Sequence, residues 1–516
     1  MPIKQDSLKK EEDIQPVQQN ISKKEESAQP ERQKSLKKKA SPAEGKSTPK
    51  KKAISLPFWK KTLQPKAAEP GWEMPAINSQ PVPLDLIEPE PEAPKEKPKI
   101  DEKEFCRKRY LAKKRAFAFC FLAALFVFQI FNLYFESYDS LSRRIKGQVS
   151  RRSFDPAELE DGMISHVAGK TRLVDYYGFL QAALQKREFN GFEYVKDEDG
   201  FLYYGSFYQD EDPYIYNYAH RVKLLQDFVE NYGTKVLFVM APGKYNPDYC
   251  KTSVGFAVND PTYAVTELIF YLRRLGVETL DLGEYIPSEE NPLADSFFKT
   301  DHHWTAPTAF LATKIMVEEM EERFGESLDP DGVYLDSERY EERESYKRML
   351  GSLGQGSGVY YAGLEDFTMI YPKEEGRYQR VSTTSDAEKE YYFGNFDETF
   401  LDKSVLAEDF DYYERTQYEF YLGGLKTIEN IRNLDKPDGP GIFMIRDSYF
   451  TPVLAFMAPM CGRIDAVYSL EGMDDFSIGD YLRESFESGT HYDYVIIEVY
   501  PYNIIGDAFR YFRNEG

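Results

Sequence analysis

One short stretch of the chain carries the residue types best suited to acid–base chemistry. Residues 297–305 read Phe-Phe-Lys-Thr-Asp-His-His-Trp-Thr and hold two of the five histidines of the chain beside a carboxylate. General-base chemistry near neutral pH favours an imidazole that a carboxylate holds in one tautomer. Asp301 and His303, two residues apart in an expected loop, can supply that pair. The stretch therefore predicts one half of an active site.

The other half must supply a nucleophile, and a serine far downstream is the best candidate. Within residues 441–450, Gly-Ile-Phe-Met-Ile-Arg-Asp-Ser-Tyr-Phe, an apolar strand runs into a turn that carries Asp447 and Ser448 and opens an apolar helix. Such a turn can present a serine hydroxyl at the edge of a sheet, while backbone N–H groups near Ser448 and Tyr449 face a developing oxyanion. We therefore expect Ser448 to act as the nucleophile.

These residues also have simpler interpretations. A histidine bonded to an aspartate is often structural, and a serine at a helix start is often an N-cap. Asp301, His302 and His303 could instead ligate a metal. A catalytic metal usually needs three protein ligands in a suitable constellation, and the other three histidines show no such spacing. We expect no metal and no cofactor, and the structural interpretations stay open.

Alternating strands and helices must position the two halves. The pattern predicts a helix over 218–232, a strand over 235–240, a helix over 261–275, a strand near 278–282 and a helix over 307–324. Thr305 is a candidate N-cap of the last helix. This alternation predicts a parallel sheet with helices on both faces, whose ligand crevice lies beyond the carboxyl ends of the strands. Both halves of the site are expected at that edge.

Residues 330–435 break the alternation. They are rich in Tyr, Glu, Asp and Gly, with short strand-like pieces at 359–361 and 367–371. We expect a β-rich insertion beside the site. Its tyrosines could stack on sugar rings, although aromatic residues at strand spacing are more often core or cross-strand pairs.

Charge divides the chain into two parts. Residues 1–115 hold 27 Lys and Arg against 18 Asp and Glu, which leaves 38 basic and 69 acidic residues in the remainder. The acidic part argues against nucleic acid or anionic lipid as its main ligand and suits an exported domain. The front is rich in Lys, Glu, Pro, Ser, Gln and Ala, a composition that predicts disorder.

An uncharged segment separates these parts. Residues 116–135 would span about 30 Å as a helix, enough to cross a bilayer. Six basic residues within 107–115 precede the segment, so we expect a cytoplasmic tail and an exported C-terminal side. A cleaved signal peptide and a buried core helix are the alternatives. The predicted organisation is a disordered tail over 1–115, a transmembrane helix over 116–135, a juxtamembrane segment over 136–194 and an extracytoplasmic domain over 195–516.

Cysteine usage gives little further constraint. The four cysteines are too few for a disulfide scaffold. Cys250 and Cys461 lie beyond the apolar segment, where a single disulfide is possible and two free, buried thiols are the preferred interpretation.

The order of these motifs resembles the DHHW protein family and its relatives, the AlgX/AlgJ-type SGNH-hydrolase-like O-acetyltransferases of bacterial polysaccharide modification. The Thr-Asp-His-His-Trp-Thr run and the later strand-Asp-Ser-aromatic turn carry the resemblance, which covers about residues 195–505. Further landmarks follow in the family's order at 200–203, 241–244, 276–277, 281–282, 351–352 and 494–498. One departure is Arg446, which stands where many SGNH proteins have the glycine of Gly-Asp-Ser.

The resemblance implies an SGNH-hydrolase-like, flavodoxin-like α/β fold with a permuted motif order, and a triad of Asp301, His303 and Ser448. It implies transfer of acetyl groups to cell-surface or exopolysaccharide hydroxyls, with a membrane-bound O-acyltransferase as the acetyl donor. A carbohydrate acetyl esterase with the same triad and a noncatalytic glycan-binding or scaffold protein are the alternatives.

Several neighbours of the triad are expected to take part. Asp447 is expected to brace the turn. The residues expected to contact substrate or shape its pocket are His302, Trp304, Lys244, Tyr449 and Arg446, and the candidate oxyanion donors are Gly351 and Asn503.

Overall fold

The computed structural model describes residues 102–132, 134, scattered positions between 142 and 156, and residues 167–207, 212–252, 255–384, 387–469 and 476–512. Most of the tail predicted to be disordered, residues 1–115, lies outside the described residues. So does most of the predicted juxtamembrane segment before residue 167.

Helix α1, Glu102–Phe131, is the one helix of the described chain that is long and apolar enough to cross a membrane. Its candidate span, Lys103–Phe131, has 29 residues, and its large apolar side chains are exposed. The helix begins before the uncharged segment because Lys, Arg, Leu and Ala are favourable helix formers.

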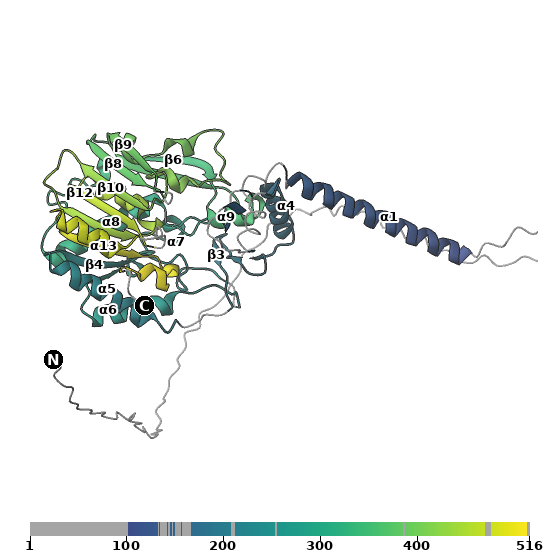
Figure 1. The fold of residues 1–516 in the computed structure, drawn as a ribbon, viewed down its shortest axis with the longest axis horizontal. Coiled ribbons are helices and arrows are strands. Elements are labelled where there is room, and N and C mark those ends of the chain that lie inside the picture. Colours follow the sequence, from purple (N-terminus) through teal and green to yellow (C-terminus); the bar gives the residue numbers. More distant parts are fainter. Residues whose placement is uncertain are drawn as a thin grey trace, which may run out of the picture. The chain divides into compact units, whose positions relative to one another are not determined.

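Eight strands of the described chain form the central sheet, in the order β5-β4-β13-β11-β12-β10-β8-β9 (Figure 1). The first five pair in parallel, and each later pair is antiparallel. The sheet is therefore mixed, whereas the sequence pattern predicted a parallel one. The strands are β4 (Lys235–Met240), β5 (Thr279–Asp281), β8 (Tyr378–Thr383), β9 (Lys389–Gly394), β10 (Ile428–Asn433), β11 (Gly441–Arg446), β12 (Arg463–Tyr468) and β13 (Tyr494–Val499).

The region over 330–435 is only partly an insertion, because three of its strands, β8, β9 and β10, extend the central sheet beyond β12. Strands β6 (Tyr340–Met349) and β7 (Glu365–Pro372) form a separate two-stranded sheet. The piece predicted as a strand at 359–361 is helical instead, within α10 (Val359–Ala362). The piece predicted as a strand at 367–371 lies within β7. Strands β8, β9 and β10 escaped prediction because they are not continuous apolar runs: β9 alternates exposed and half-buried residues.

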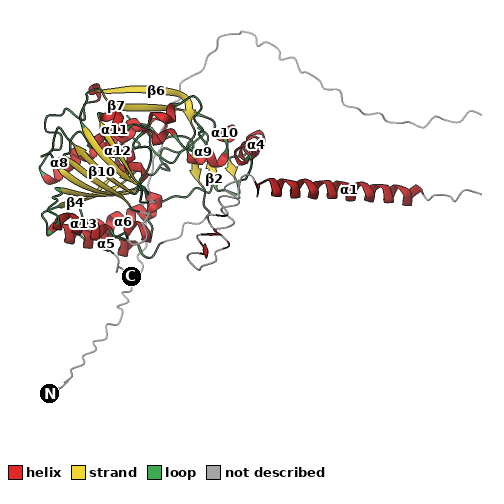
Figure 2. Cartoon of the chain, turned by 45° about the horizontal axis from the view of Figure 1, so that its top comes forward, coloured by secondary structure: helices red, strands yellow, loops and turns green. Residues whose placement is uncertain are grey.

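Helices cover both faces of the sheet, as the sequence predicted (Figure 2). Along β11, Ile442 and Met444 join the core beneath α8 (Ala306–Phe324) and α12 (Thr451–Met457). Phe443 and Ile445 join the core of the other face. The helices of that face are α5 (Ile215–Glu230), α6 (Thr262–Arg274) and α13 (Ile478–Glu487).

A smaller group of elements comes from two parts of the chain, one before β4 and one after β6. It contains α4 (Lys170–Ala183), α9 (Ser352–Ser357), α10 and a three-stranded sheet of β1 (Glu188–Phe189), β2 (Tyr194–Lys196) and β3 (Leu202–Tyr204). Helix α4 contacts α9 and α10, and α9 contacts β3. The remaining short elements are α7 (Leu293–Ser296), α11 (Phe396–Phe400), η2 (Leu282–Glu284), η3 (Ser337–Arg339), η4 (Lys403–Leu406), η5 (Gln417–Phe420), η6 (Ser448–Phe450), η7 (Pro501–Asn503) and η8 (Gly506–Phe509).

Local signals place the site-bearing segments as predicted. The Thr305 hydroxyl accepts from the Thr308 N–H at 3.4 Å and caps α8, whose first turn holds a proline. Strand β11 ends at Arg446 and leads through η6 into α12. Cys250 and Cys461 are both free thiols.

Candidate active site

The histidine loop is held by a buried carboxylate from β7. The Glu365 side chain accepts from the N–H groups of Lys299 and Thr300, each at 2.7 Å. Burial raises the pKa of Glu365, and these hydrogen bonds oppose the rise. Two successive N–H groups on one carboxylate fix the backbone just before Asp301.

A buried lysine holds the same loop from the other side. The Lys244 ammonium donates to the carbonyl oxygens of Leu202 at 2.7 Å, Lys299 at 2.9 Å and Asp301 at 2.7 Å. Burial lowers the pKa of Lys244 to about 8. Because its three N–H groups donate to backbone oxygens, Lys244 supports the loop. The expectation that Lys244 contacts substrate directly is therefore corrected.

The loop and the distant serine meet in one hydrogen-bonded chain. Nδ1 of His303 lies 2.7 Å from Oδ1 of Asp301, and Nε2 of the same ring lies 2.7 Å from Oγ of Ser448. Asp301 is buried, and Ser448 is half-buried. The fold thus brings together residues that lie 145 positions apart in the sequence.

The electrostatics of this chain suit a neutral base beside an ionised acid. Burial alone would raise the pKa of Asp301, but the adjacent imidazoles of His303 and His302 and their hydrogen bonds lower it well below its usual range. Burial and the neighbouring His302 ring lower the pKa of His303. At neutral pH the Asp301 carboxylate therefore accepts from Nδ1–H, and Nε2 is free to accept a proton from Ser448.

Asp447 braces the serine turn, as expected. Its Oδ1 accepts from the Tyr449 N–H at 2.9 Å, and its Oδ2 accepts from the Tyr500 N–H at 2.9 Å and from Nδ2 of Asn503 at 2.8 Å. Behind it, the Asp447 N–H donates to Glu498 at 2.9 Å. Burial, together with the Asp447 charge, raises the pKa of Glu498 well above its usual range.

Arg446 clamps the same turn from within the protein. Its Nη1 donates to the Asp447 carbonyl at 3.3 Å and to the Thr451 hydroxyl at 3.2 Å, and its Nη2 donates to the Lys426 carbonyl at 3.5 Å. The side chain is fully buried. The expectation that Arg446 contacts substrate is therefore corrected: this buried cation lies beneath the turn and ties its two ends to the loop residue Lys426 just before β10.

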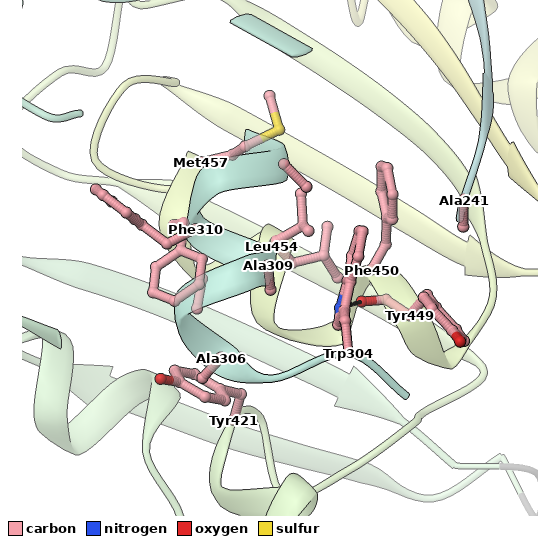
Figure 3. Packing of buried hydrophobic residues seen from close by; sticks show 14 of the residues in the cluster. Ala241, Trp304, Ala306, Ala309, Phe310, Tyr421, Tyr449, Phe450, Leu454 and Met457 are labelled. Carbon is pink, nitrogen blue, oxygen red and sulfur yellow. Dashed lines mark hydrogen bonds between the residues drawn. The ribbon is translucent and has the colours of Figure 1, made fainter. Parts of the chain in front are cut away.

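Trp304 and Tyr449 lie in the core under the site. Nε1 of Trp304 donates to the Tyr449 carbonyl at 3.2 Å (Figure 3), and the Tyr449 hydroxyl donates to the His302 carbonyl. Both side chains are fully buried. They join the histidine loop to the serine turn. Because both side chains are buried, the expectation that they contact substrate is also corrected.

His302 is the member of the expected substrate set that keeps exposed surface, with 20% of its side chain accessible. Its Nδ1 lies 3.0 Å from the Ser352 hydroxyl, and its ring packs against His303 with 3.9 Å between centroids. The Ser352 N–H donates to Oδ2 of Asp301 at 3.0 Å. The ring of His302 therefore forms part of the rim beside the reacting atoms.

The two candidate oxyanion donors differ. The single N–H of Gly351 donates to the Thr300 hydroxyl at 2.8 Å, so this candidate is corrected. Gly351 serves close packing instead, because a Cβ there would lie 2.2 Å from Cβ of Asp301. Asn503 commits one amide hydrogen to Asp447 and retains a second.

Sequence reasoning missed three supporting residues: Glu365, Ser352 and Tyr418. The Tyr418 ring stacks on His303 with 4.0 Å between centroids, and its hydroxyl donates to the Tyr449 carbonyl at 3.1 Å. Ser352 follows a glycine that the sequence had singled out. Glu365 and Tyr418 carry no local signal, since only the folded chain brings them to the loop.

The histidine stretch could in principle hold a metal, because Asp301, His302 and His303 offer ligand atoms within 4.8 Å of one another. Both ring nitrogens of His303 are already hydrogen-bonded, to Asp301 and to Ser448. Nδ1 of His302 is bonded to Ser352. A metal bound through His303 would break the chain that links the imidazole to the serine.

Comparison with known proteins gives a family match for part of the domain. Residues 195–390 match the family model described as SGNH hydrolase-like domain, acetyltransferase AlgX. The matched region contains the histidine loop and ends before Ser448. Curated protein sequences give no match.

Solved structures similar to part of this chain include an O-acetyltransferase domain and a DHHW family protein. Bacillus cereus PatB1 with a sulfonyl adduct has 16% identity and a TM-score of 0.49, covering 62% of this chain and 97% of that one. A DHHW family protein from Eubacterium siraeum has 17% identity and a TM-score of 0.43, covering 61% and 93%. The O-acetyltransferase domain of Pseudomonas putida AlgJ has 12% identity and a TM-score of 0.37, covering 60% and 91%.

The family match confirms the resemblance that the sequence motifs indicated. The described chain contains an SGNH hydrolase-like domain, built on a mixed central sheet with flanking helices, and its residues 195–390 are similar to the acetyltransferase domain of AlgX.

Proposed function

We propose that this protein, whose residues 195–390 match an AlgX-type acetyltransferase domain, moves acetyl groups to polysaccharide hydroxyls through Ser448, His303 and Asp301. One observation carries the proposal. The imidazole of His303 lies 2.7 Å from both the Asp301 carboxylate and the Ser448 hydroxyl, the geometry of an activated nucleophile.

In the first step, Oγ of Ser448 attacks the carbonyl carbon of an acetyl ester or thioester, and Nε2 of His303 takes the hydroxyl proton. The tetrahedral intermediate collapses, the leaving oxygen or sulfur takes that proton from His303, and an acetyl ester remains on Ser448. Asp301 holds the imidazole in its tautomer and stabilises the imidazolium. The N–H of Ser448 and the second amide hydrogen of Asn503 are our proposed donors to the oxyanion.

In the second step, a sugar hydroxyl attacks the acetyl-Ser448 carbonyl while His303 takes its proton. Collapse returns the proton to Ser448 and releases the acetylated sugar. Water would give an acetyl esterase with the same residues. A bound hydroxyl can outcompete water, because correct positioning is worth about 7–11 kcal/mol of the barrier.

The membrane setting also belongs to the proposal. Helix α1 is long enough to span a bilayer, and basic residues precede its uncharged part. We propose a single-pass type II protein with an extracytoplasmic catalytic domain. Cytosolic acetyl groups must then cross the membrane, so a membrane-bound O-acyltransferase is the proposed donor.

Brief exposure of the purified full-length protein to p-nitrophenyl acetate, followed by peptide mass spectrometry, tests the proposal. One added acetyl group is expected on the peptide that holds Ser448. Ser448→Ala should abolish acetylation with little change in thermal unfolding, since a hydroxyl at a helix start is worth about 0.5–2 kcal/mol. Thr451→Ser, three residues on, is a matched control that should keep acetylation.

Polysaccharide added to the same reaction separates the two enzymatic outcomes. Acetylated sugar is expected for a transferase, whereas free acetate alone would identify an esterase. Absence of acetyl-Ser448 in the wild type, together with full cellular function of Ser448→Ala, would overturn the enzymatic proposal in favour of a scaffold.

A further inference from the structure

Helix α4 presents its large apolar side chains to solvent. Five of them recur with helical spacing and form one stripe, which we call the α4 stripe. Phe179 is a sixth exposed apolar side chain of this helix, outside the stripe. Its ring lies 6.2 Å from that of Tyr360 in α10, which adds a further exposed aromatic side chain to this surface. The α4 stripe consists of Leu173, Tyr176, Tyr177, Leu180 and Leu184, with exposed fractions of 55%, 69%, 42%, 56% and 68%.

The opposite side of α4 is small and polar, and it is this side that packs on the domain. A Cβ on Gly178 would lie 2.5 Å from the Ser357 carbonyl oxygen, and one on Gly358 would lie 2.9 Å from the Val174 carbonyl oxygen. The Asp175 carboxylate accepts from the Val359 N–H at 2.9 Å and from the Tyr413 hydroxyl. Helix α4 is therefore fixed by close backbone contact and hydrogen bonds, which leaves the stripe outward.

An exposed apolar stripe of three turns is unusual for a protein that meets only water, and such patches mark partner or membrane surfaces. The charges around the stripe favour anionic lipid. Segment 170–188 holds four cations against two carboxylates, Asp175 and Glu188, although the whole chain has a net charge of −22. Lys186 pairs with Glu188 at 3.1 Å and Arg187 with Glu198 at 3.3 Å, so the charge argument rests on Lys170 and Arg172.

The placement of two of these cations is informative. Lys170 and Arg172 lie in the first turn of α4, which holds no acidic residue. Cations at that end oppose the helix dipole, so helix stability does not account for them. Basic side chains flanking an apolar face are typical of helices that lie in the headgroup region of a bilayer.

A bilayer is also within reach of the helix. Residues 132–169 join α1 to α4, and the Ala168 N–H donates to Oδ1 of Asn132 at 2.7 Å, so the chain just before α4 lies beside the end of α1. We infer that α4 is an interfacial helix, whose stripe enters the outer surface of the anionic bilayer that α1 crosses. The inference rests on the membrane anchoring proposed above.

Such an attachment would act close to the site. Helix α4 contacts α9 and α10. The first residue of α9, Ser352, donates to Asp301 and contacts His302. A single short helix therefore separates the lipid-binding surface from the triad, which would hold the reacting serine near the membrane through which the acetyl donor arrives.

Quenching by brominated lipid tests the inference on the full-length chain. The protein carries Tyr176→Trp in the stripe or, as a matched control, Tyr391→Trp on β9, since these tyrosines are 69% and 71% exposed. Each variant is reconstituted into phosphatidylglycerol–phosphatidylcholine vesicles with or without bromine on the acyl chains, and wild-type emission is subtracted. The emission added by Tyr176→Trp should be mostly lost in brominated vesicles, and that added by Tyr391→Trp should be unchanged.

A second substitution distinguishes insertion of the stripe into lipid from mere closeness of the domain to the bilayer. Leu180→Glu in the Tyr176→Trp protein should restore most of the emission, because a carboxylate resists insertion and Leu180 is not needed for the core. Flotation with the vesicles but equal emission of Tyr176→Trp in both lipids would overturn the inference and indicate a protein partner, a second copy or another segment of this chain. Failure to float with the vesicles would overturn membrane anchoring and the inference together.

Discussion

Two buried aspartates flank the reacting atoms, and they do different work. Asp301 accepts from a side chain, the His303 imidazole at 2.7 Å, as well as from the Ser352 N–H. The Asp447 carboxylate accepts from two backbone N–H groups and from the Asn503 amide. One carboxylate touches the titrating ring, and the other touches groups that never change charge.

The difference shows that the role of a buried carboxylate follows from the groups that donate hydrogen bonds to it. Each aspartate lies within two positions of a triad residue in the sequence, so spacing alone cannot separate them. A carboxylate on an imidazole stabilises the imidazolium that forms during proton transfer. A carboxylate on backbone N–H groups stabilises a turn. The same substitution at both positions should therefore produce opposite patterns of damage.

Asp301→Asn should give the largest loss of activity. Both oxygens of Asp301 accept, one from His303 and one from Ser352, and an amide can accept with only one. If the amide donates to His303, the ring is held in the wrong tautomer, which costs about 10⁴-fold in rate. Rates of Ser448 acetylation at pH 7 measure the loss. A variant that keeps wild-type activity would show that Asp301 is structural.

Asp447→Asn, the matched change, should damage stability more than chemistry. In either orientation the new NH₂ group faces other donors, the Tyr500 N–H and the Asn503 amide at one position or the Tyr449 N–H at the other, and a buried unsatisfied donor costs about 1–3 kcal/mol. We expect a lower melting temperature and, in the folded fraction, a rate loss of about 10²-fold from a displaced serine. Unchanged melting with a 10⁴-fold loss would erase the distinction between the two aspartates.

The sequence predicted those parts of the site that depend on neighbouring residues. Asp301 and His303 share a loop, and the apolar run before Ser448 gave β11 its bounds. Buried strands such as β4 were predicted because they are continuous apolar runs, whereas β9 alternates and was missed.

What escaped prediction depends on contacts made across the fold. Glu365 reaches the histidine loop from β7, 66 positions from Lys299. Arg446 and Lys244 were expected at the substrate because they lie in sequence motifs beside the proposed site. Burial reverses that expectation, since a buried cation whose donors meet carbonyl oxygens becomes a support.

The acid limb of the pH–rate profile distinguishes the two aspartates more finely. The pKa of His303 lies below its usual 6.5, chiefly because the ring is buried. The base works when neutral, so kcat/KM for ester cleavage should fall as the pH drops through this lowered pKa, and half of the maximum should lie below pH 6.5. Asp447→Asn should lower that midpoint only slightly, because the Asp447 charge raises the pKa of His303 less than the Asp301 charge does. Asp301→Asn should move it lower, because the carboxylate that favours the imidazolium is gone.

Ser352→Ala should have the smallest effect. The N–H of Ser352 supports Asp301, and alanine keeps that bond, whereas the lost hydroxyl contacts Nδ1 of His302. Removal of one half-exposed hydrogen bond costs about 0.5–1.5 kcal/mol, so acetylation should slow by less than about tenfold. Ser352→Pro, which removes the N–H but occupies the first position of α9, should reproduce part of the Asp301→Asn loss. Acetylation rates and melting temperatures of both variants distinguish the role of the Ser352 hydroxyl from that of its N–H. An Ala variant as inactive as Asp301→Asn would mean that His302, through its bond to Ser352, takes part in proton transfer.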